Sequence, residues 1–305
     1  MAVIAGPAHY SGRPMSTVWA VVVTYNRRDL LEECLAELAG QTRPLDHVLV
    51  VDNASSDGTA EMVRQKHPGL GLLALAENVG GAGGFNRGME VAYAGGADWI
   101  WLMDDDTIPT PDALAELLAA PDELPSSLPR PLLLASKAVW TDGSLHPMNH
   151  PGFERNHPEL LIQGCERGLM PLRTSTFVSL LVHRDAVEHH GLPLAHYFIW
   201  SDDIEYTARV TRAGGGAYLV PTSVVQHKTK TAYTAVSTSG TRFYYHVRNY
   251  VYMIRGSAWD AREKLTLVWL LSRTSLQYLR YNSFAKVNMT VILRGLRDGL
   301  LTPAK

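Results

Sequence analysis

Three consecutive carboxylates, Asp104, Asp105 and Asp106, carry the strongest chemical signal in this 305-residue chain. They directly follow an apolar run, residues 99–103, that is typical of a buried strand. Carboxylates this close repel one another, and a hard divalent ion such as Mg²⁺ or Mn²⁺ removes the repulsion and also bridges a diphosphate. Because one residue separates Asp104 from Asp106, both can face the same side of an extended turn. The pattern predicts a metal site, and an acidic loop or helix cap is the alternative.

A second acidic pair, Asp202 and Asp203, precedes a helical pattern that ends near residue 213. Repulsion between adjacent carboxylates raises the pKa of one of them, which suits a general base that works near neutral pH. The alternative for Asp202 is a structural one, because an aspartate at this point also caps a helix.

These acids need elements that bring them together, and the hydrophobic pattern supplies a scheme. Apolar runs, the first of them rich in β-branched residues, predict four strands, which alternate with amphipathic segments that predict three helices. The strands are residues 18–24, 47–51, 70–75 and 99–103, and the helices are residues 29–38, 59–67 and 86–93. This alternation is typical of an α/β fold with parallel strands, whose ligands bind beyond the carboxyl ends of the strands. Later in the chain, short strands are predicted over residues 177–182 and 217–220.

Polar loops follow these predicted strands and offer contacts to a nucleotide. The candidate binding residues are Thr24, Asn26 and Arg27 after the first strand, Asp52 and Asn53 after the second, and Asn78, Gly81, Gly84 and Arg87 after the third. A carboxylate suits a uracil N–H or ribose hydroxyls, glycines permit close backbone approach, and arginine suits phosphate. The glycine spacing does not match the dinucleotide fingerprint G-x-G-x-x-G.

Four motifs occur in order along the chain, namely VVVTYNR, VVDNASSDGT, NVGGAGGFNRG and WIWLMDDD. Together they resemble the inverting nucleotide-sugar glycosyltransferases of family 2, which have the GT-A fold, a Rossmann-like α/β fold. The resemblance covers about residues 16–230. It implies a Mn²⁺- or Mg²⁺-dependent enzyme that uses a nucleotide sugar.

The resemblance also assigns roles to single residues. It implies that Asp203 is the general base and that Asp202 orients the acceptor or supports the base. His227 matches a histidine that completes the metal site in the galactofuranosyltransferases of the family, together with Asp104 and Asp106. Asp105 and Trp200 complete the expected binding set, although Ser201 separates Trp200 from the acids where a polymerising relative has tryptophan directly before them.

Within the family, the segments Phe-Ile-Trp…Asp-Asp and FYYHVRNYVY resemble actinobacterial enzymes of cell-wall galactan synthesis. The short chain resembles the initiating galactofuranosyltransferase type. This implies UDP-galactofuranose as donor and a polyprenyl-diphosphate-linked GlcNAc–rhamnose acceptor. A dTDP-rhamnose-dependent rhamnosyltransferase is the main alternative, and a two-metal phosphoesterase and a non-catalytic lipid-binding scaffold are two further ones.

Charge divides the chain into two unlike parts. Residues 1–227 hold 27 acidic and 15 basic residues, whereas residues 228–305 hold 13 basic and 3 acidic ones. We therefore expect an irregular leader over 1–15, a glycosyltransferase domain over 16–235 and a helical segment over 236–305, with three helices over 242–255, 262–280 and 283–300. The basic, aromatic composition of the last segment predicts contact with an anionic membrane surface or, alternatively, packing against the domain or another subunit of a homo-oligomer.

Global features complete the expectations. The net charge of −2 does not indicate a nucleic-acid partner, and two cysteines build neither a disulfide framework nor a four-cysteine zinc site. The sequence contains no typical secretory signal and no run near the ~20 apolar residues of a membrane span. The expected location is cytoplasmic, peripheral on the inner face of the plasma membrane.

Overall fold

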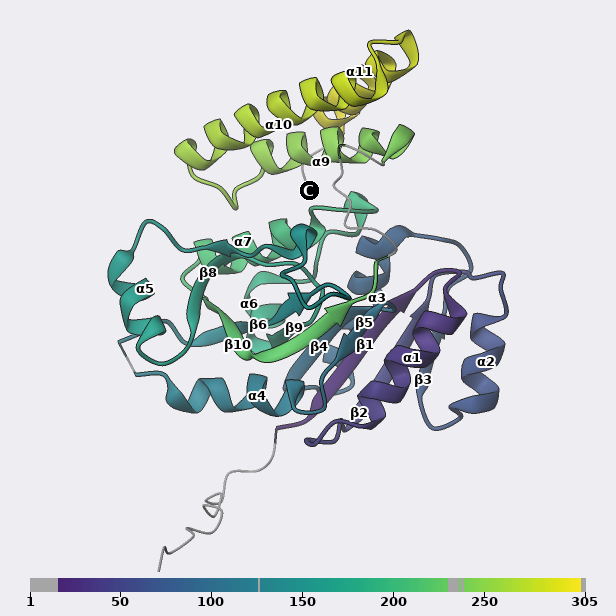
Figure 1. Cartoon of the computed structure of the whole chain (residues 1–305), viewed down its shortest axis with the longest axis vertical. Coiled ribbons are helices and arrows are strands. Elements are labelled where there is room, and N and C mark those ends of the chain that lie inside the picture. The colour runs from purple at the N-terminus through teal and green to yellow at the C-terminus, as the bar shows by residue number, and fades with distance from the viewer. Residues whose placement is uncertain (1–15, 126, 230–235, 237–238, 303–305) are drawn as a thin grey trace, which may run out of the picture.

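The computed structural model describes residues 16–125, 127–229, 236 and 239–302. The expected leader (1–15) and the expected domain boundary at 235 lie outside these residues. Figure 1 shows a central twisted sheet with helices on both faces and a separate layer of helices beyond one edge of the sheet. This α/β architecture confirms the predicted fold class.

The first half of the chain builds the predicted parallel unit. Strands β1 (Val18–Thr24), β2 (His47–Asp52), β3 (Gly71–Ala74) and β4 (Trp99–Asp104) are joined by α1 (Arg28–Ala39), α2 (Thr59–Lys66) and α3 (Gly80–Ala94). The strands lie in the order β3-β2-β1-β4, and all three pairs are parallel. Their carboxyl ends, and the polar loops that follow them, therefore meet at one edge of the sheet.

The second half of the chain adds antiparallel strands to this parallel unit and so makes the complete sheet mixed. It contains β5 (Thr107–Pro109), α4 (Ala113–Ala119), β6 (Pro131–Val139), β7 (Gly152–Phe153), α5 (Pro158–Cys165), β8 (Met170–Thr174), β9 (Leu180–His183), α6 (Arg184–His190), α7 (Asp202–Arg212) and β10 (Gly216–His227). The sheet continues β4-β9-β6-β10-β8-β7, with β9 antiparallel to both β4 and β6. The short strand β5 pairs antiparallel with the end of β10.

Side chains that alternate along β1 fill two cores. Val21 and Val23 pack with residues of α3, α6 and α7 on one face, whereas Val18, Ala20 and Val22 pack with residues of α1, α2 and α4 on the other. A strand that is apolar at every position must be covered on both faces, and this is what the sequence of β1 encodes.

Three predicted helices form the layer beyond the sheet edge. They are α9 (Phe243–Arg255), α10 (Ala261–Asn282) and α11 (Lys286–Leu301), preceded by a short 3-10 helix, η4 (Gly240–Arg242). Phe243, Val247 and Val251 of α9 pack with apolar residues of α10 and α11. Within the described ranges, no helix combines the length and apolar character that crossing a bilayer requires.

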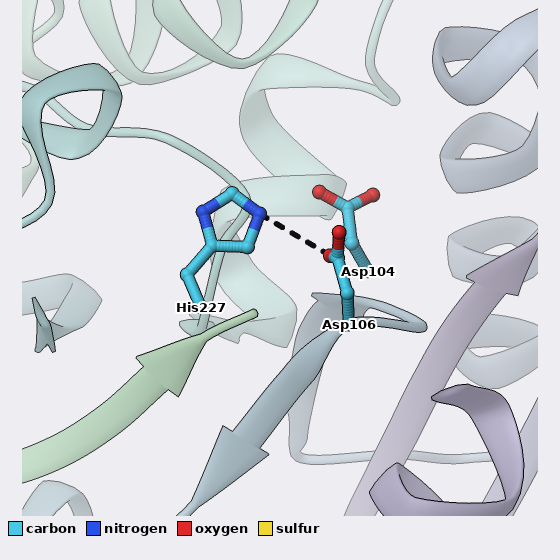
Figure 2. Close-up of side chains that lie close together, drawn as sticks. All are labelled: Asp104, Asp106 and His227. Carbon is cyan, nitrogen blue, oxygen red and sulfur yellow. Dashed lines mark ion pairs between the residues drawn. The ribbon is translucent and has the colours of Figure 1, made fainter. Parts of the chain in front are cut away.

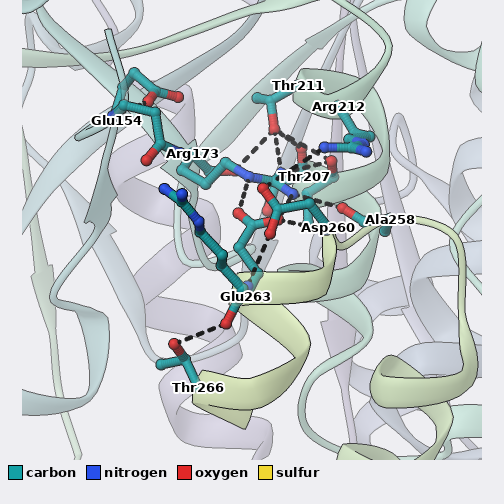
Figure 3. Close-up of polar contacts among 12 residues, drawn as sticks. Glu154, Arg173, Thr207, Thr211, Arg212, Ala258, Asp260, Glu263 and Thr266 are labelled. Atoms are coloured by element: carbon teal, nitrogen blue, oxygen red, sulfur yellow. Dashed lines mark hydrogen bonds and ion pairs between the residues drawn. The ribbon is translucent and has the colours of Figure 1, made fainter. Parts of the chain in front are cut away.

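Arg173 of β8 anchors the start of this layer (Figure 3). Its guanidinium contacts Glu263 of α10 at 2.6 Å and donates to the carbonyl of Ala208 in α7 at 2.6 Å. Asp260 and Glu263 form a capping box that begins α10. The same arginine lies 4.9 Å from the ring centroid of Trp259. One partly buried cation thus joins β8, α7 and the first turn of α10.

Several helices and strands have bounds that differ from the predicted ones. Helix α3 begins at Gly80, not at residue 86, so the glycine-rich segment forms the first turns of the helix. Added Cβ atoms at Gly84 and Gly88 would lie 2.6 and 2.3 Å from the side chains of Val23 and Val21. These glycines therefore permit close packing of α3 on β1. The strand expected at 217–220 extends to His227, and the strand expected at 177–182 is shorter and shifted, as β9.

Candidate active site

Asp104, Asp106 and His227 converge at the carboxyl edge of the sheet (Figure 2). One potential ligand atom from each lies within 4.8 Å of the other two. The antiparallel pairing of β5 with β10 places His227 opposite Thr107, directly beyond the aspartates. The carboxylate Oδ1 of Asp106 lies 3.2 Å from His227 Nε2, yet it is buried without a hydrogen bond of good geometry.

This donor set fits a divalent ion. Two carboxylates and an imidazole nitrogen suit Mn²⁺ or Mg²⁺, and the orphaned oxygen of Asp106 is the kind of buried acceptor that an ion would satisfy. The predicted trio is therefore brought together in space, and each of its members can supply a ligand atom.

Asn149, at the end of the 3-10 helix η2 (Pro147–Asn149), orients the histidine. Its Oδ1 lies 2.8 Å from His227 Nδ1 and accepts a hydrogen bond from it, so Nε2 faces Asp106 and is the nitrogen available to an ion. Its Nδ2 donates to Thr176 Oγ1 at 3.0 Å. Sequence reasoning did not identify Asn149, because it lies in an irregular segment with no periodicity or motif.

Asp105 turns away from this cluster. It is 3% exposed, accepts from Thr24 Oγ1 at 2.8 Å and pairs with Arg27 Nη1 at 3.1 Å. Arg27 Nη1 also contacts Asp106 Oδ2 at 2.7 Å. The predicted binding residues Thr24 and Asp105 thus use their polar atoms on protein partners, and Arg27 neutralises part of the acidic cluster.

The electrostatics of the three aspartates differ. Burial, and then the charge of Asp106, raises the pKa of Asp104 to about 7. Burial raises the pKa of Asp105 to about 6 against the opposing effect of Arg27. Burial acts in the same direction on Asp106, but His227 and Arg27 outweigh it and lower the pKa of that carboxyl. A cluster that resists full ionisation in this way gains from a bound cation.

Asp202 and Asp203 form the first residues of α7, on the layer side of the same edge. Burial, followed by the charge of Asp203, raises the pKa of Asp202 well above its usual range, and Asp104 adds to the effect. The two acidic sites are therefore electrostatic neighbours. Burial raises the pKa of Asp203 to about 6, although its Oδ1 accepts from the Ile204 N–H at 2.7 Å. A carboxyl with this pKa is ionised at neutral pH and basic enough to accept a proton.

The loops after β1 and β2 bind each other. Asn26 adopts a φ of 52° and accepts from the Ser56 N–H at 2.8 Å through its Oδ1. Asp52 Oδ1 accepts from the Ser55 N–H at 3.0 Å. These contacts shape the edge of the sheet at which the predicted nucleotide residues gather.

Asn53 and Asn78 shape the entry to α3. The side chain of Asn53 donates to the Gly80 carbonyl at 2.8 Å and accepts from the Val79 N–H at 2.9 Å, whereas Asn78 Oδ1 accepts from the Gly80 N–H at 2.8 Å. An added Cβ at Gly81 would meet no atom within 4 Å, so this predicted binding residue faces open space.

Arg87 is placed differently from its predicted phosphate role. It lies about 10 Å along α3 from Gly80, since a helix rises about 1.5 Å per residue. Its neighbour Gly88 packs against Val21, at mid-strand. Arg87 itself pairs with Glu90 on the exposed side of the helix at 2.6 Å. The structure does not bring it to the acidic cluster.

Trp200 lies in a strained segment directly before the acids. Phe198, Trp200 and Ser201 all have positive φ, between 64° and 67°. For residues other than glycine each such conformation costs about 1–3 kcal/mol and tends to occur at functional sites. The Arg242 guanidinium lies 5.7 Å from the ring centroid of Trp200, so the predicted stacking residue already has a cationic partner.

Residues 19–182 match the family model described as Glycosyl transferase family 2. The matched segment contains β2, β3, β4, all of β1 except its first residue, and the three aspartates at the end of β4. The chain belongs to glycosyl transferase family 2. As a member of this family it is a glycosyltransferase with the GT-A fold, which confirms the fold and the class of activity predicted from the motifs.

Similar proteins within the family act on sugars. The chain is 33% identical over 204 residues to the galactofuranosyltransferase GlfT1 of Mycolicibacterium smegmatis, with 65% of this chain and 66% of the relative covered. It is 29% identical over 237 residues to the N-acetylglucosaminyl-diphospho-decaprenol L-rhamnosyltransferase of Mycobacterium tuberculosis, with 68% of this chain and 74% of the relative covered. The match thus spans about two thirds of the galactofuranosyltransferase.

A solved structure shares the fold of this family 2 chain over most of its length. Residues 1–349 of S. aureus TarS in complex with UDP superpose with a TM-score of 0.62 at 16% identity, with 93% of this chain and 80% of that chain covered. The similarity extends beyond the segment that matches the family model.

Proposed function

We propose that the chain transfers galactofuranose from UDP-galactofuranose to a polyprenyl-diphosphate-linked GlcNAc–rhamnose acceptor, with inversion, and so starts galactan synthesis. The observation that carries the proposal is the convergence of Asp104, Asp106 and His227 in a chain that is 33% identical to a galactofuranosyltransferase. The histidine lies at the end of β10 and the aspartates lie at the end of β4, so the site forms only where these two elements meet.

Different side chains hold the ion and accept the proton. A divalent ion held by Asp104, Asp106 and His227 would neutralise charge on the leaving diphosphate. Asp203 removes the proton of the acceptor hydroxyl as its oxygen bonds to the anomeric carbon, and the bond from that carbon to the diphosphate breaks to release UDP. Asn149 holds His227 in the tautomer that presents Nε2.

A rhamnosyltransferase is the second candidate, because the similarity to the L-rhamnosyltransferase covers a larger share of that relative than the similarity to GlfT1 does. Both candidates use the same fold, acids and type of lipid-linked acceptor. They differ in the sugar and the base of the donor.

The decisive experiment supplies one donor at a time. Purified protein with Mn²⁺ or Mg²⁺ is incubated with UDP-galactofuranose, UDP-galactopyranose or dTDP-rhamnose and a synthetic lipid-diphosphate GlcNAc–rhamnose acceptor, and product masses are measured. Hexose addition from the furanose donor alone supports the proposal. Deoxyhexose addition from dTDP-rhamnose supports the second candidate, and phosphate release without sugar transfer indicates a phosphoesterase.

We also propose that α10 and α11 lie on an anionic membrane surface, where such an acceptor resides. Large apolar side chains are exposed along both helices and the turn between them, namely Leu265, Val268, Trp269, Leu276, Tyr281, Phe284, Val287, Met289, Leu293, Leu300 and Leu301. Residues 261–302 hold seven basic residues and two acidic ones, and both acids pair with arginine. Exposed apolar and aromatic side chains in a segment with an excess of cations are typical of an interfacial helix.

Vesicles test this surface. The variant Leu265→Ser/Trp269→Ser should lose binding to phosphatidylglycerol vesicles, while wild type binds them and ignores phosphatidylcholine ones. Ile162→Ser is the matched control, because Ile162 is an exposed apolar residue of α5, far from this surface in the chain. Binding that survives the double substitution contradicts the proposal, and a concentration-dependent dimer that it disrupts identifies a subunit contact instead.

A further inference from the structure

The segment that leads into the acidic pair is bent into a shape it would not adopt alone. Phe198, Trp200 and Ser201 are three of the seven non-glycine residues with positive φ in the described part of the chain. L-residues enter this region rarely and stay there only where surrounding contacts over-determine the backbone. Contacts from outside the segment must therefore hold it.

Asn249 of α9 makes those contacts. Its side chain is 0% exposed. Its Nδ2 donates to the carbonyls of Tyr197 at 3.1 Å, Ile199 at 2.8 Å and Trp200 at 2.8 Å. An amide has two N–H groups, so three carbonyls of one bent segment share a single donor nitrogen. A regular strand or helix cannot present its carbonyls in this way.

Arg248 orients that amide. Its Nε and Nη2 donate to Asn249 Oδ1 at 3.1 and 3.0 Å, which leaves Nδ2 facing the carbonyls. Its Nη2 also donates to the Tyr197 carbonyl at 2.7 Å. The guanidinium lies over the rings of Tyr244, Tyr245 and Tyr252 at 5.0–5.5 Å, which restricts its own movement.

Helix α3 closes the other side of the segment. The Ala82 N–H donates to the Phe198 carbonyl at 3.1 Å. Gly80 has a φ of 76°, and an added Cβ there would lie 1.9 Å from the same carbonyl oxygen. The bent segment is thus held between the start of α3 and the middle of α9, immediately before the first turn of α7.

We propose that Asn249, oriented by Arg248, is a positioning residue that holds segment 196–201 and thereby places the base Asp203 for proton abstraction. This gives a role to the Arg-Asn pair in the middle of FYYHVRNYVY. It rests on the proposed role of Asp203. Apart from Trp200, the residues that we predict to bind the nucleotide lie on other elements, helix α3 and the loops after β1, β2, β3 and β4, so we expect loss of Asn249 to lower turnover and to leave nucleotide binding intact.

The test compares Asn249→Ala and Asn249→Asp with Asn288→Ala. The aspartate keeps the shape of asparagine but turns a carboxylate oxygen toward three carbonyls. Asn288 is a matched control, because its amide also donates to two carbonyls, those of Asn282 and Ser283, in the turn between α10 and α11. The measurements are kcat and KM with whichever donor supports transfer, UDP–Mn²⁺ affinity by calorimetry, and amide hydrogen exchange of residues 196–205.

We expect both Asn249 variants to lose about 10²-fold in kcat, the scale of a misplacement near 1 Å, with UDP affinity within about twofold of wild type. Amide exchange should accelerate in 196–205, and Asn288→Ala should match wild type. Unchanged kcat, or UDP affinity that falls in step with kcat, overturns the proposal.

Two further arms keep the outcomes distinct. If the Asn249 variants do not fold, Arg248→Lys decides, because it keeps the charge and removes the fork that orients the amide. Full kcat in that variant overturns the proposal. If wild type transfers no sugar while the variants still exchange faster only in 196–205, the holding of the segment stands and the proposed function falls.

Discussion

Replacing Asp104 with asparagine should reduce the pH dependence of stability in the metal-free protein. The pKa of Asp104 is raised to about 7, chiefly by burial, whereas an unfolded aspartate titrates near 3.8. The folded state therefore binds a proton that the unfolded state releases, and stability falls as pH rises from about 4 to about 7. Asparagine carries no charge at any pH and does not contribute to this fall.

The size of the effect follows from the pKa. Between pH 5 and the raised value near 7 lie about two pKa units, and at 1.36 kcal/mol per unit the share of Asp104 is about 3 kcal/mol. For a chain of this size 1 kcal/mol corresponds to about 2 °C, so wild type should lose about 6 °C more than the variant between pH 5 and pH 8.

The assay is thermal unfolding in EDTA at pH 5 and pH 8, repeated at pH 8 with Mn²⁺. An ion at 100 times its Kd stabilises wild type by about 2.7 kcal/mol, and Asp104→Asn should lose most of this gain. Asp29→Asn, at an exposed position of α1, is the control. Equal pH slopes in wild type and Asp104→Asn, or an equal response to Mn²⁺, would refute the reasoning.

Three further predictions concern the base, the packing of α3 and the anchor of the helical layer. Asp203→Asn should lower kcat by about 10²–10⁴-fold, with UDP affinity retained in calorimetry. Because the base must be ionised, wild-type kcat should rise with pH through about 6. Weakened UDP binding in the variant would contradict the role of Asp203 as a base that does not bind the nucleotide. Gly88→Ala should lower the free energy of unfolding by about 1–3 kcal/mol in denaturant melts, because its Cβ would lie 2.3 Å from the side chain of Val21. Gly69→Ala is the control and should leave the free energy of unfolding unchanged, because no atom lies within 4 Å of the added Cβ. Arg173→Met should lower the free energy of unfolding by about 3–5 kcal/mol, because it breaks the largely buried ion pair with Glu263. It should also speed proteolysis between β10 and α10. Unchanged cleavage would argue against an anchoring role for Arg173.

The position of the aspartates and the class of enzyme followed from local sequence. An apolar run that ends in three aspartates predicts that they lie at the end of a buried strand, and strands separated by amphipathic segments pair in parallel with their carboxyl ends together. The three C-terminal helices were also predicted from local sequence, because each segment mixes aromatic or aliphatic residues with Arg and Lys. Predictions that need only one element and its immediate neighbours were confirmed, except for the bounds of α3, β9 and β10.

The sequence by itself also determined which residue types were available to the site, but the tertiary structure decided which of them meet. His227 reaches Asp106 through the antiparallel pairing of β5 with β10, and Asn149 and Asn249 reach their partners over separations of 78 and about 50 residues. Such contacts depend on strand order and helix packing, which leave no periodic signal in the chain. The same packing gave Gly84 a place against β1 and left Arg87 at mid-helix, so similar motif residues acquired different surroundings.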